Sequence, residues 1–179
     1  MRCFLALPLT ETMKKEISEQ ITELRRNYIK QIKWTSPEAM HITMIFFGDV
    51  NTEQLDTIIT SVNSVSRLPG PFALEVHGIG TFPPKGAPRV FHGMVSKGYP
   101  ECVDIYQSVT NVLPKSVYTP EKRRFVPHVT LGRVRKGRKI FIDERPRLSV
   151  QGQISSLVLY ESKLNRAGPE YSVVREWCL

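Results

Sequence analysis

Short blocks of apolar residues alternate with polar ones along the chain, and their spacing predicts a mixture of strands and helices. Period-two alternation among β-branched and aromatic residues is typical of half-exposed strands. It predicts strands at 1–8, 41–47, 72–77, 89–95, 125–134, 154–161 and 171–177. Apolar residues that recur every three or four positions predict helices with one buried face. These helices are expected at 10–28, 51–65 and 100–113, with a connector at 33–37.

The predicted strands are short and polar on one face. Strands of a parallel α/β sheet are instead buried on both faces and read as nearly continuous apolar runs. We therefore predict an α+β fold with mainly antiparallel sheets flanked by helices. Because no long linker or low-complexity segment interrupts the pattern, residues 1–179 are expected to form a single domain.

One short motif occurs in two of the predicted strands, as His41-Ile42-Thr43-Met44 and as His128-Val129-Thr130-Leu131. Side chains alternate faces along a strand, so each histidine shares a face with its own threonine. The residues predicted to face the core are Ile42, Met44, Phe46, Val129 and Leu131. Each motif follows a predicted strand and helix. This order predicts two lobes related by a pseudo-two-fold axis, with both motifs in a central cleft.

Two histidines on rigid strands are suited to acid–base catalysis. Imidazole has an unperturbed pKa of about 6.5, so near neutral pH one ring can be held neutral and another protonated. In-line displacement at phosphorus needs a base for the attacking oxygen and an acid for the departing one. The hydroxyls of Thr43 and Thr130 can donate to non-bridging phosphate oxygens and stabilise the charge that builds there.

The charge of the chain favours a polyanionic partner. Lys and Arg number 25 against 17 Asp and Glu, which gives a net charge of +8 and favours nucleic acid. Basic residues gather around the second motif: Lys122, Arg123, Arg124, Arg133, Arg135, Lys136, Arg138 and Lys139. We therefore expect this segment to attract the rest of a polyanion whose phosphate lies between the motifs.

Cysteine usage and hydropathy indicate a cytoplasmic protein. The three cysteines are far apart and lack CxxC spacing, which argues against a disulfide framework and a structural zinc site. The apolar stretch at the N-terminus is too short for a signal peptide. No apolar run approaches the roughly 20 residues of a membrane-spanning helix, so no membrane partner is expected.

The two motifs and their surroundings resemble the two-histidine phosphoesterase superfamily, and the LigT-like RNA 2′,3′-cyclic phosphodiesterases in particular. The resemblance covers nearly the whole chain. Beyond the motifs it rests on the opening strand 1–7, on the flanks of the first motif at 34–40 and 45–48, and on later segments at 88–93, 125–128, 159–162 and 168–171.

The resemblance implies metal-independent hydrolysis of RNA 2′,3′-cyclic phosphate ends to 2′-phosphomonoesters, without a cofactor. By analogy His41 is the proton donor to the leaving 3′-oxygen, His128 is the proton acceptor that activates water, and Thr43 and Thr130 bind phosphate oxygens. Some family members also join RNA ends through a 2′-5′ linkage, so ligation is a secondary expectation. RNA ends are the expected partner of a monomeric protein.

Arg133 is the least determined of the candidate substrate-binding residues. Similar proteins carry an arginine near this place, yet strict alternation from His128 puts residue 133 on the opposite face of the strand. A β-bulge at Gly132 would redirect Arg133 towards phosphate.

Alternative functions remain open from the sequence. One is a non-catalytic RNA-end or nucleotide-binding module, against which the intact histidines argue. Another is a phosphodiesterase for small cyclic nucleotides or 2′-5′ oligoadenylates, over which the basic segment favours RNA. A zinc site on His41 and His128 lacks a third and fourth ligand at a recognisable spacing.

Overall fold

Strands and helices alternate through the first two thirds of the chain, and only strands follow in the described remainder. The computed structural model describes residues 1–120, 123–138, 140, 147–165 and 168–179. Its elements in chain order are β1 (Arg2–Pro8), α1 (Glu11–Gln20), α2 (Thr22–Asn27), β2 (Ile32–Trp34), the short 3-10 helix η1 (Pro37–Ala39), β3 (His41–Asp49), α3 (Thr52–Asn63), β4 (Phe72–Phe82), β5 (Val90–Val95), α4 (Tyr99–Val112), β6 (His128–Val134), β7 (Ser149–Ile154), β8 (Ser156–Asn165) and β9 (Gly168–Cys178).

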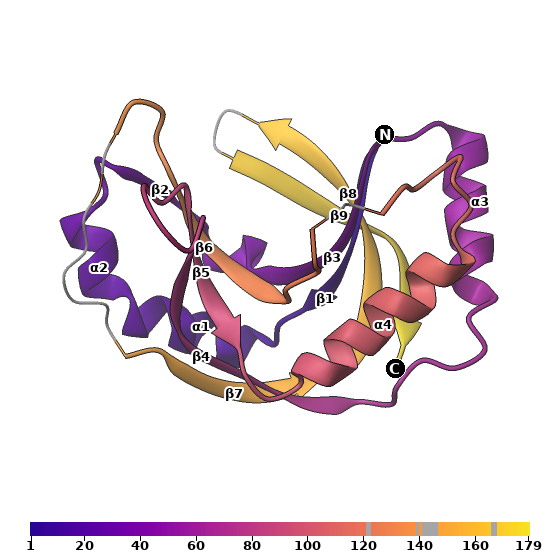
Figure 1. Ribbon diagram of the computed structural model, residues 1–179, viewed down its shortest axis with the longest axis horizontal. Helices are drawn as coiled ribbons and strands as arrows, with labels where there is room; N and C mark the ends of the chain where they lie inside the picture. Colours follow the sequence, from indigo (N-terminus) through magenta and orange to yellow (C-terminus); the bar gives the residue numbers. More distant parts are fainter. Residues whose placement is uncertain (121–122, 139, 141–146, 166–167) are drawn as a thin grey trace.

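Within the described residues, nine strands form one curled sheet, with α1 and α2 on one side of the molecule and α3 and α4 on the other (Figure 1). The strand order is β7-β4-β5-β6-β3-β1-β8-β9, with β2 beside β6, and every described pairing is antiparallel. This order divides into two four-stranded halves that meet between β6 and β3, the two motif strands. The predicted α+β fold, with two antiparallel lobes about a pseudo-two-fold axis, is confirmed.

Two of the described helices, α1 and α3, begin at a side chain that caps the first turn. The Thr10 hydroxyl accepts a hydrogen bond from the backbone N–H of Met13 (3.2 Å) at the start of α1. Asn51 and Gln54 form a reciprocal capping box at the start of α3, with N···O distances of 2.8 and 3.0 Å. The apolar faces of the longer helices are buried against the core, through Met13, Ile17, Ile58, Val62, Cys102, Ile105 and Val109.

Some predicted boundaries are wrong. The helix predicted at 10–28 is two helices, because Ile21 leaves the helical conformation at φ −102° and ψ 11°. The predicted connector contains part of β2, which forms by pairing with β6. The sequence pattern omits β7, in which Gly152 weakens the alternation, and extends β6 upstream of His128, where the strand begins.

A β-bulge in β3 changes the alternation of faces just after the motif. The pairing of β3 with β1 skips Met44, so Met44 and Ile45 are both buried and Phe46 returns to the face that carries His41. Phe46 is therefore 50% exposed, and the prediction that it faces the core is wrong. The other residues predicted to face the core are buried: Ile42, Met44, Val129 and Leu131.

Candidate active site

A bulge recurs at the same place in β6. The pairing of β6 with β5 skips Leu131, so Leu131 and Gly132 are both buried and Arg133 returns to the face of His128. A Cβ atom on Gly132 would lie 2.6 Å from Cγ2 of Ile32, so glycine at the bulge also lets β2 approach. The bulge decides the position of Arg133, which the sequence left open. Arg133 takes the place in β6 that Phe46 takes in β3, since each lies five residues after the motif histidine.

The two motif strands are neighbours, and their described pair joins the residues between the histidine and the threonine of each motif. Continuing this antiparallel register by one residue places His41 beside Thr130 and Thr43 beside His128. All four side chains project to one face, because the paired residues between them project to the other. Each threonine therefore neighbours the histidine of the other motif.

His41 is held by contacts on both of its ring nitrogens. Its Nδ1–H donates to the Ala39 carbonyl (2.9 Å), and its Nε2 lies 3.0 Å from the Thr43 hydroxyl. A carbonyl oxygen only accepts, so the neutral ring carries its proton on Nδ1 and accepts at Nε2. The Phe4 ring stacks on His41 with centroids 4.9 Å apart, and Tyr171 meets it edge-on at 5.4 Å.

This packing favours the neutral form of His41. The pKa of His41 is lowered from 6.5 to about 4, and burial is the main cause. The hydrogen bond to Ala39 partly opposes this effect, whereas the positive charges of Lys14 and His128 contribute to it to a smaller extent. An anion bound between the motifs would act in the opposite direction, because opposite charge stabilises imidazolium.

His128 is anchored in the same way but packs against different rings. Its Nδ1–H donates to the carbonyl of Val126 (2.7 Å), which lies two residues earlier in the chain. The hydrogen bond from His41 to Ala39 spans the same number of residues. The His128 ring meets Phe82 edge-on at 5.0 Å and His92 at 5.2 Å. Burial is the main cause that lowers the pKa of His128, with a smaller contribution from the positive charge of Arg133.

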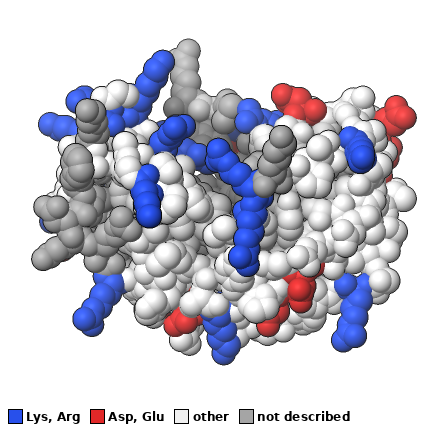
Figure 2. Space-filling model, in the orientation of Figure 1, with Lys and Arg blue, Asp and Glu red and all other residues white. Residues whose placement is uncertain are grey.

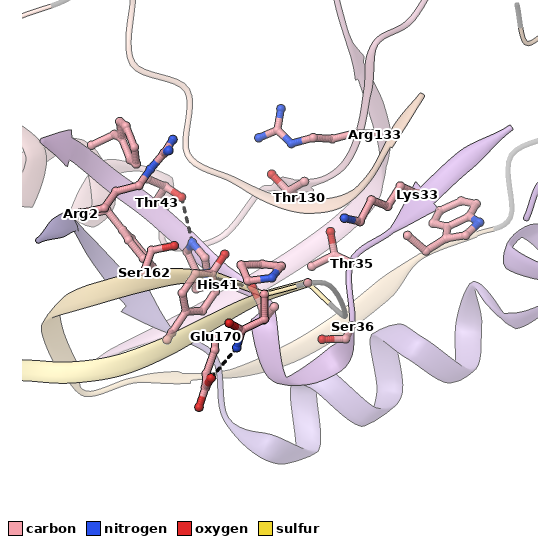
Figure 3. A pocket seen from close by; sticks show the side chains of 18 residues that line it. Arg2, Lys33, Thr35, Ser36, His41, Thr43, Thr130, Arg133, Ser162 and Glu170 are labelled. Atoms are coloured by element: carbon pink, nitrogen blue, oxygen red, sulfur yellow. Dashed lines mark hydrogen bonds between the residues drawn. The ribbon is translucent and has the colours of Figure 1, made fainter. Parts of the chain in front are cut away.

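A cavity of about 890 Å³ opens over three of the four motif residues, His41, Thr43 and Thr130. Figure 3 shows the side chains that line it. The cavity is lined by His41, Thr43, Thr130 and Arg133, together with Arg2, Phe4, Lys33, Trp34, Thr35, Ser36, Ala39, Phe46, Ser162, Asn165, Gly168, Pro169, Glu170 and Tyr171. His128 is not among these lining residues. Because its strand neighbour Thr43 and its own Thr130 both line the cavity, His128 lies at the border.

Positive side chains dominate the charge of this cavity. Arg2, Lys33 and Arg133 line it, and Glu170 is the single carboxylate among the described lining residues. Figure 2 shows Lys and Arg side chains around the hollow on this face of the molecule. None of the three cations takes part in the described ion pairs, which join Lys14 to Glu11, Lys15 to Glu19 and Lys163 to Glu161. The cavity therefore presents unneutralised positive charge to a ligand.

The structure brings four of the five predicted site residues to one cavity and the fifth to its border. Among the described members of the predicted basic segment, Arg133 alone lines the cavity. Lys122 and Lys139 lie outside the described residues. The sequence did not single out Arg2 or Tyr171. Each is an isolated residue, brought to the site by strand pairing in β1 and β9, and neither follows a motif.

Two further features bear on function. Within the described part of the chain, three or more His, Cys, Asp or Glu side chains do not gather anywhere in an arrangement that could hold a metal ion. Among the described helices, none has the length and apolar character needed to cross a membrane.

The fold and the paired motifs define a two-histidine phosphoesterase. The family model described as LigT like Phosphoesterase matches residues 11–92, which include the first motif. An RNA 2′,3′-cyclic phosphodiesterase of Thermotoga maritima is 32% identical over 181 residues, covering 98% of this chain and 94% of the relative. One from Methanothermobacter thermautotrophicus is 33% identical over 180 residues, covering 96% and 95%. The chain therefore belongs to the LigT-like phosphoesterase family.

Solved structures agree with this assignment. A protein of Thermus thermophilus superimposes with a TM-score of 0.83 at 26% identity, covering 100% of this chain and 98% of its own. Escherichia coli LigT complexed with 3′-AMP superimposes with a TM-score of 0.79 at 20% identity, covering 99% and 97%. These similarities confirm the LigT-like fold over the whole chain.

Proposed function

We propose that the protein hydrolyses RNA 2′,3′-cyclic phosphate ends to 2′-phosphomonoesters, with His41 as proton donor and His128 as proton acceptor and without a metal ion. Curated relatives about 30% identical over nearly the full chain bear the name of this activity. The observation that carries the proposal is the matched anchoring of two imidazoles on adjoining strands, beside one positively charged cavity.

The anchoring determines which nitrogen reacts. In both histidines the backbone carbonyl two residues upstream holds Nδ1–H, so Nε2 is the atom left for proton transfer. Nε2 of His41 already lies 3.0 Å from the hydroxyl of Thr43, within the cavity. Fixed ring orientation places the proton-transfer atoms before the substrate binds, which lowers the cost of reaching the reactive geometry.

The proposed reaction uses each histidine for one proton transfer. Neutral His128 takes a proton from water through Nε2, and the water oxygen forms a new bond to phosphorus. The bond from phosphorus to the 3′-oxygen breaks, and protonated His41 gives its Nε2 proton to the departing oxygen. The product is a 2′-phosphate with a free 3′-hydroxyl. Each histidine ends in the protonation state in which the other began, so proton exchange with solvent restores the enzyme.

The threonines and Arg133 suit the charge that develops on phosphate. Hydroxyls of Thr43 and Thr130 come from the two sides of the motif junction and can donate to different non-bridging oxygens. The guanidinium of Arg133, exposed and without a described carboxylate partner, offers paired donors to the same group. The remaining positive charge around the hollow favours a polyanion over a neutral ligand.

The activity is tested with a short RNA that ends in a 2′,3′-cyclic phosphate, in excess EDTA. We expect the wild-type protein to release the 2′-phosphate alone, and His41→Ala and His128→Ala each to lose about 10²–10⁴-fold in rate. Circular dichroism verifies that both variants fold. If the wild-type protein binds this RNA but does not turn it over, the proposal gives way to an RNA-end-binding module.

Ligation is the same displacement with a ribose 5′-hydroxyl in place of water. It would join the ends through a 2′-5′ linkage, because the 3′-oxygen is again the leaving group. Adding an RNA with a free 5′-hydroxyl to the assay separates the two reactions by product length. We expect hydrolysis to dominate, and ligation, where it occurs, to depend on the same two histidines.

A further inference from the structure

Arg2 lies on the ring of Phe46 at the cavity. The guanidinium carbon of Arg2 is 4.9 Å from the centroid of the Phe46 ring, which is within the range of a cation–π interaction. Both residues line the cavity that contains Thr43 and Thr130. Figure 3 shows that Arg2 and Arg133 extend from the two sides of these threonines. Neither the activity proposed above nor the motifs use Arg2.

The pseudo-two-fold arrangement gives Arg2 a counterpart. The position five residues after the histidine holds an arginine in β6, Arg133, and a phenylalanine in β3, Phe46. Both positions reach the cavity face through the same bulge. On the β6 side the motif strand thus supplies the cation itself. On the β3 side the motif strand supplies an aromatic face, and the neighbouring strand β1 supplies the cation that rests on it.

We propose that Arg2, held on Phe46, is a second phosphate-binding group of the cleft and the counterpart of Arg133. The inference rests on the proposed function, because it takes the ligand to be an RNA end. The phosphate that Arg2 contacts is either the reacting cyclic phosphate or the phosphodiester that links the terminal nucleotide to the one before it. Both phosphates offer the same kind of anionic oxygen to Arg2. The experiment below distinguishes between these two possible ligands.

Charge and exposure favour phosphate as the ligand of Arg2. Arg2 is exposed and forms none of the ion pairs described in the structure, so its charge is available to an anion. Stacking on Phe46 restricts the guanidinium without neutralising it. A planar fork of donors that is already oriented loses less freedom when it binds phosphate.

The first experiment compares Arg2→Ala with wild type on two substrates: a nucleoside 2′,3′-cyclic phosphate, which has no linking phosphate, and a dinucleotide with a 2′,3′-cyclic phosphate end. We expect kcat/KM of Arg2→Ala to fall about 10- to 100-fold, the usual effect of removing a hydrogen bond to a charged group. A loss on both substrates assigns Arg2 to the reacting phosphate. A loss on the dinucleotide alone assigns it to the linking phosphate.

Arg26→Ala is the matched control, because Arg26 is an exposed arginine in α2 that does not line the cavity. Like Arg2→Ala, this variant removes one positive charge from the protein, but it leaves the proposed contact between Arg2 and phosphate in place. If Arg2→Ala behaves like Arg26→Ala on both substrates, the inference is overturned. The proposed function is unaffected by that result, because it depends on turnover by the wild-type protein.

A binding measurement tests Arg2 independently of turnover. The affinity of the wild-type protein for a dinucleotide with a 2′-phosphate end falls as NaCl rises. The slope of log affinity against log salt should be shallower in Arg2→Ala than in the wild-type protein, because one contact between a cation and a phosphate is lost. An unchanged slope in Arg2→Ala, equal to that of Arg26→Ala, would overturn the inference even if the protein hydrolyses nothing.

The role of Phe46 is tested by a double-variant cycle. Phe46→Leu keeps an apolar side chain but removes the ring, so it should reproduce part of the loss caused by Arg2→Ala. In the Arg2→Ala background, Phe46→Leu should cause no further loss, because the ring acts through the arginine. If Phe46→Leu reduces kcat/KM while Arg2→Ala does not, the ring binds a nucleobase directly and the inference is wrong.

Discussion

The His41 side and the His128 side of the cleft share one backbone design and differ in what surrounds the imidazole. Both motif strands carry the same bulge, and both histidines donate Nδ1–H to the carbonyl two residues upstream. On one side Phe4 and Tyr171 pack on His41, and Thr43 occupies its Nε2. On the other side the ring contacts are with Phe82 and His92.

This difference shows how a pseudo-symmetric fold can yield two distinct acid–base groups. The backbone determines which nitrogen of each ring is available, and it does so identically in both halves. The neighbouring rings and charges then set each pKa separately, and the shift is large enough to give a value of about 4 for His41. Variants that act on one half only can therefore reveal the separate contribution of each histidine.

The largest effect should come from changing the leaving group in a histidine variant. A 2′,3′-cyclic substrate with bridging sulfur in place of the 3′-oxygen expels a thiolate, which needs no proton. His41→Ala should therefore recover most of its 10²–10⁴-fold loss on this substrate, whereas His128→Ala should recover none. Initial rates of 2′-phosphate formation measure the recovery of both variants. If only His128→Ala recovers on this substrate, His128 is the proton donor and His41 is the proton acceptor.

The two threonines should separate the halves by a smaller factor. Thr43→Val and Thr130→Val each remove a donor to phosphate, and we expect kcat to fall about 10- to 100-fold in each. Thr43→Val should cause the greater loss, because this hydroxyl also holds Nε2 of His41. The serine variants are the controls, since they keep the hydroxyl and should stay near the wild-type rate. Equal losses in the two valine variants would remove this distinction between the halves.

Sequence reasoning predicted the motif strands, the caps of α1 and α3 and the two-lobed α+β fold. These features depend on local pattern: period-two alternation, side chains that cap helices, and a repeated tetrapeptide. Local pattern could not show that β3 and β6 each contain an extra residue. Strict alternation therefore placed Phe46 in the core and left the face of Arg133 undecided, although both residues line the cavity.

The remaining site residues depend on strand pairing between distant segments. Arg2 and Phe4 reach the cleft because β1 pairs with β3, and Tyr171 because β9 follows β8 beside β1. The segments 1–7 and 168–171 contribute to the resemblance to the family, but they contain no catalytic motif that would assign these three residues to the site. Sheet register is a property of the whole fold, so a sequence can reveal the motifs while leaving their partners unidentified.

The pH dependence of stability should report the burial of His41. Its pKa is about 4 in the folded protein against an ordinary value of 6.5, so the unfolded chain binds more protons between these pH values. The folded state is thus fully favoured above pH 6.5 and loses stability as the pH falls towards 4. Between pH 7.5 and 5 this group accounts for a loss of about 2 kcal/mol.

Urea denaturation of His41→Asn at both pH values measures this contribution. The variant should lose less stability on acidification than the wild-type protein does. His128→Asn should show the same trend to a smaller extent, since the pKa of His128 is also lowered by burial. If His41→Asn loses as much stability as wild type between the two pH values, His41 is not held in its neutral form by the fold.

The smallest effect, and the one that joins the two halves, is the position of the pH optimum. Catalysis needs one histidine protonated and the other neutral, and kcat/KM reports the pKa values of the free enzyme. Both values lie below 6.5, so kcat/KM should be bell-shaped with its optimum on the acid side of pH 6.5. Above the optimum kcat/KM should fall about tenfold per pH unit, because the fraction of enzyme with one of the two histidines protonated decreases.

The optimum for kcat should lie at higher pH than the optimum for kcat/KM, since the bound phosphate raises both pKa values. An optimum for kcat/KM at or above pH 7 would show that the charges of the cleft, not the burial of its rings, control the pair.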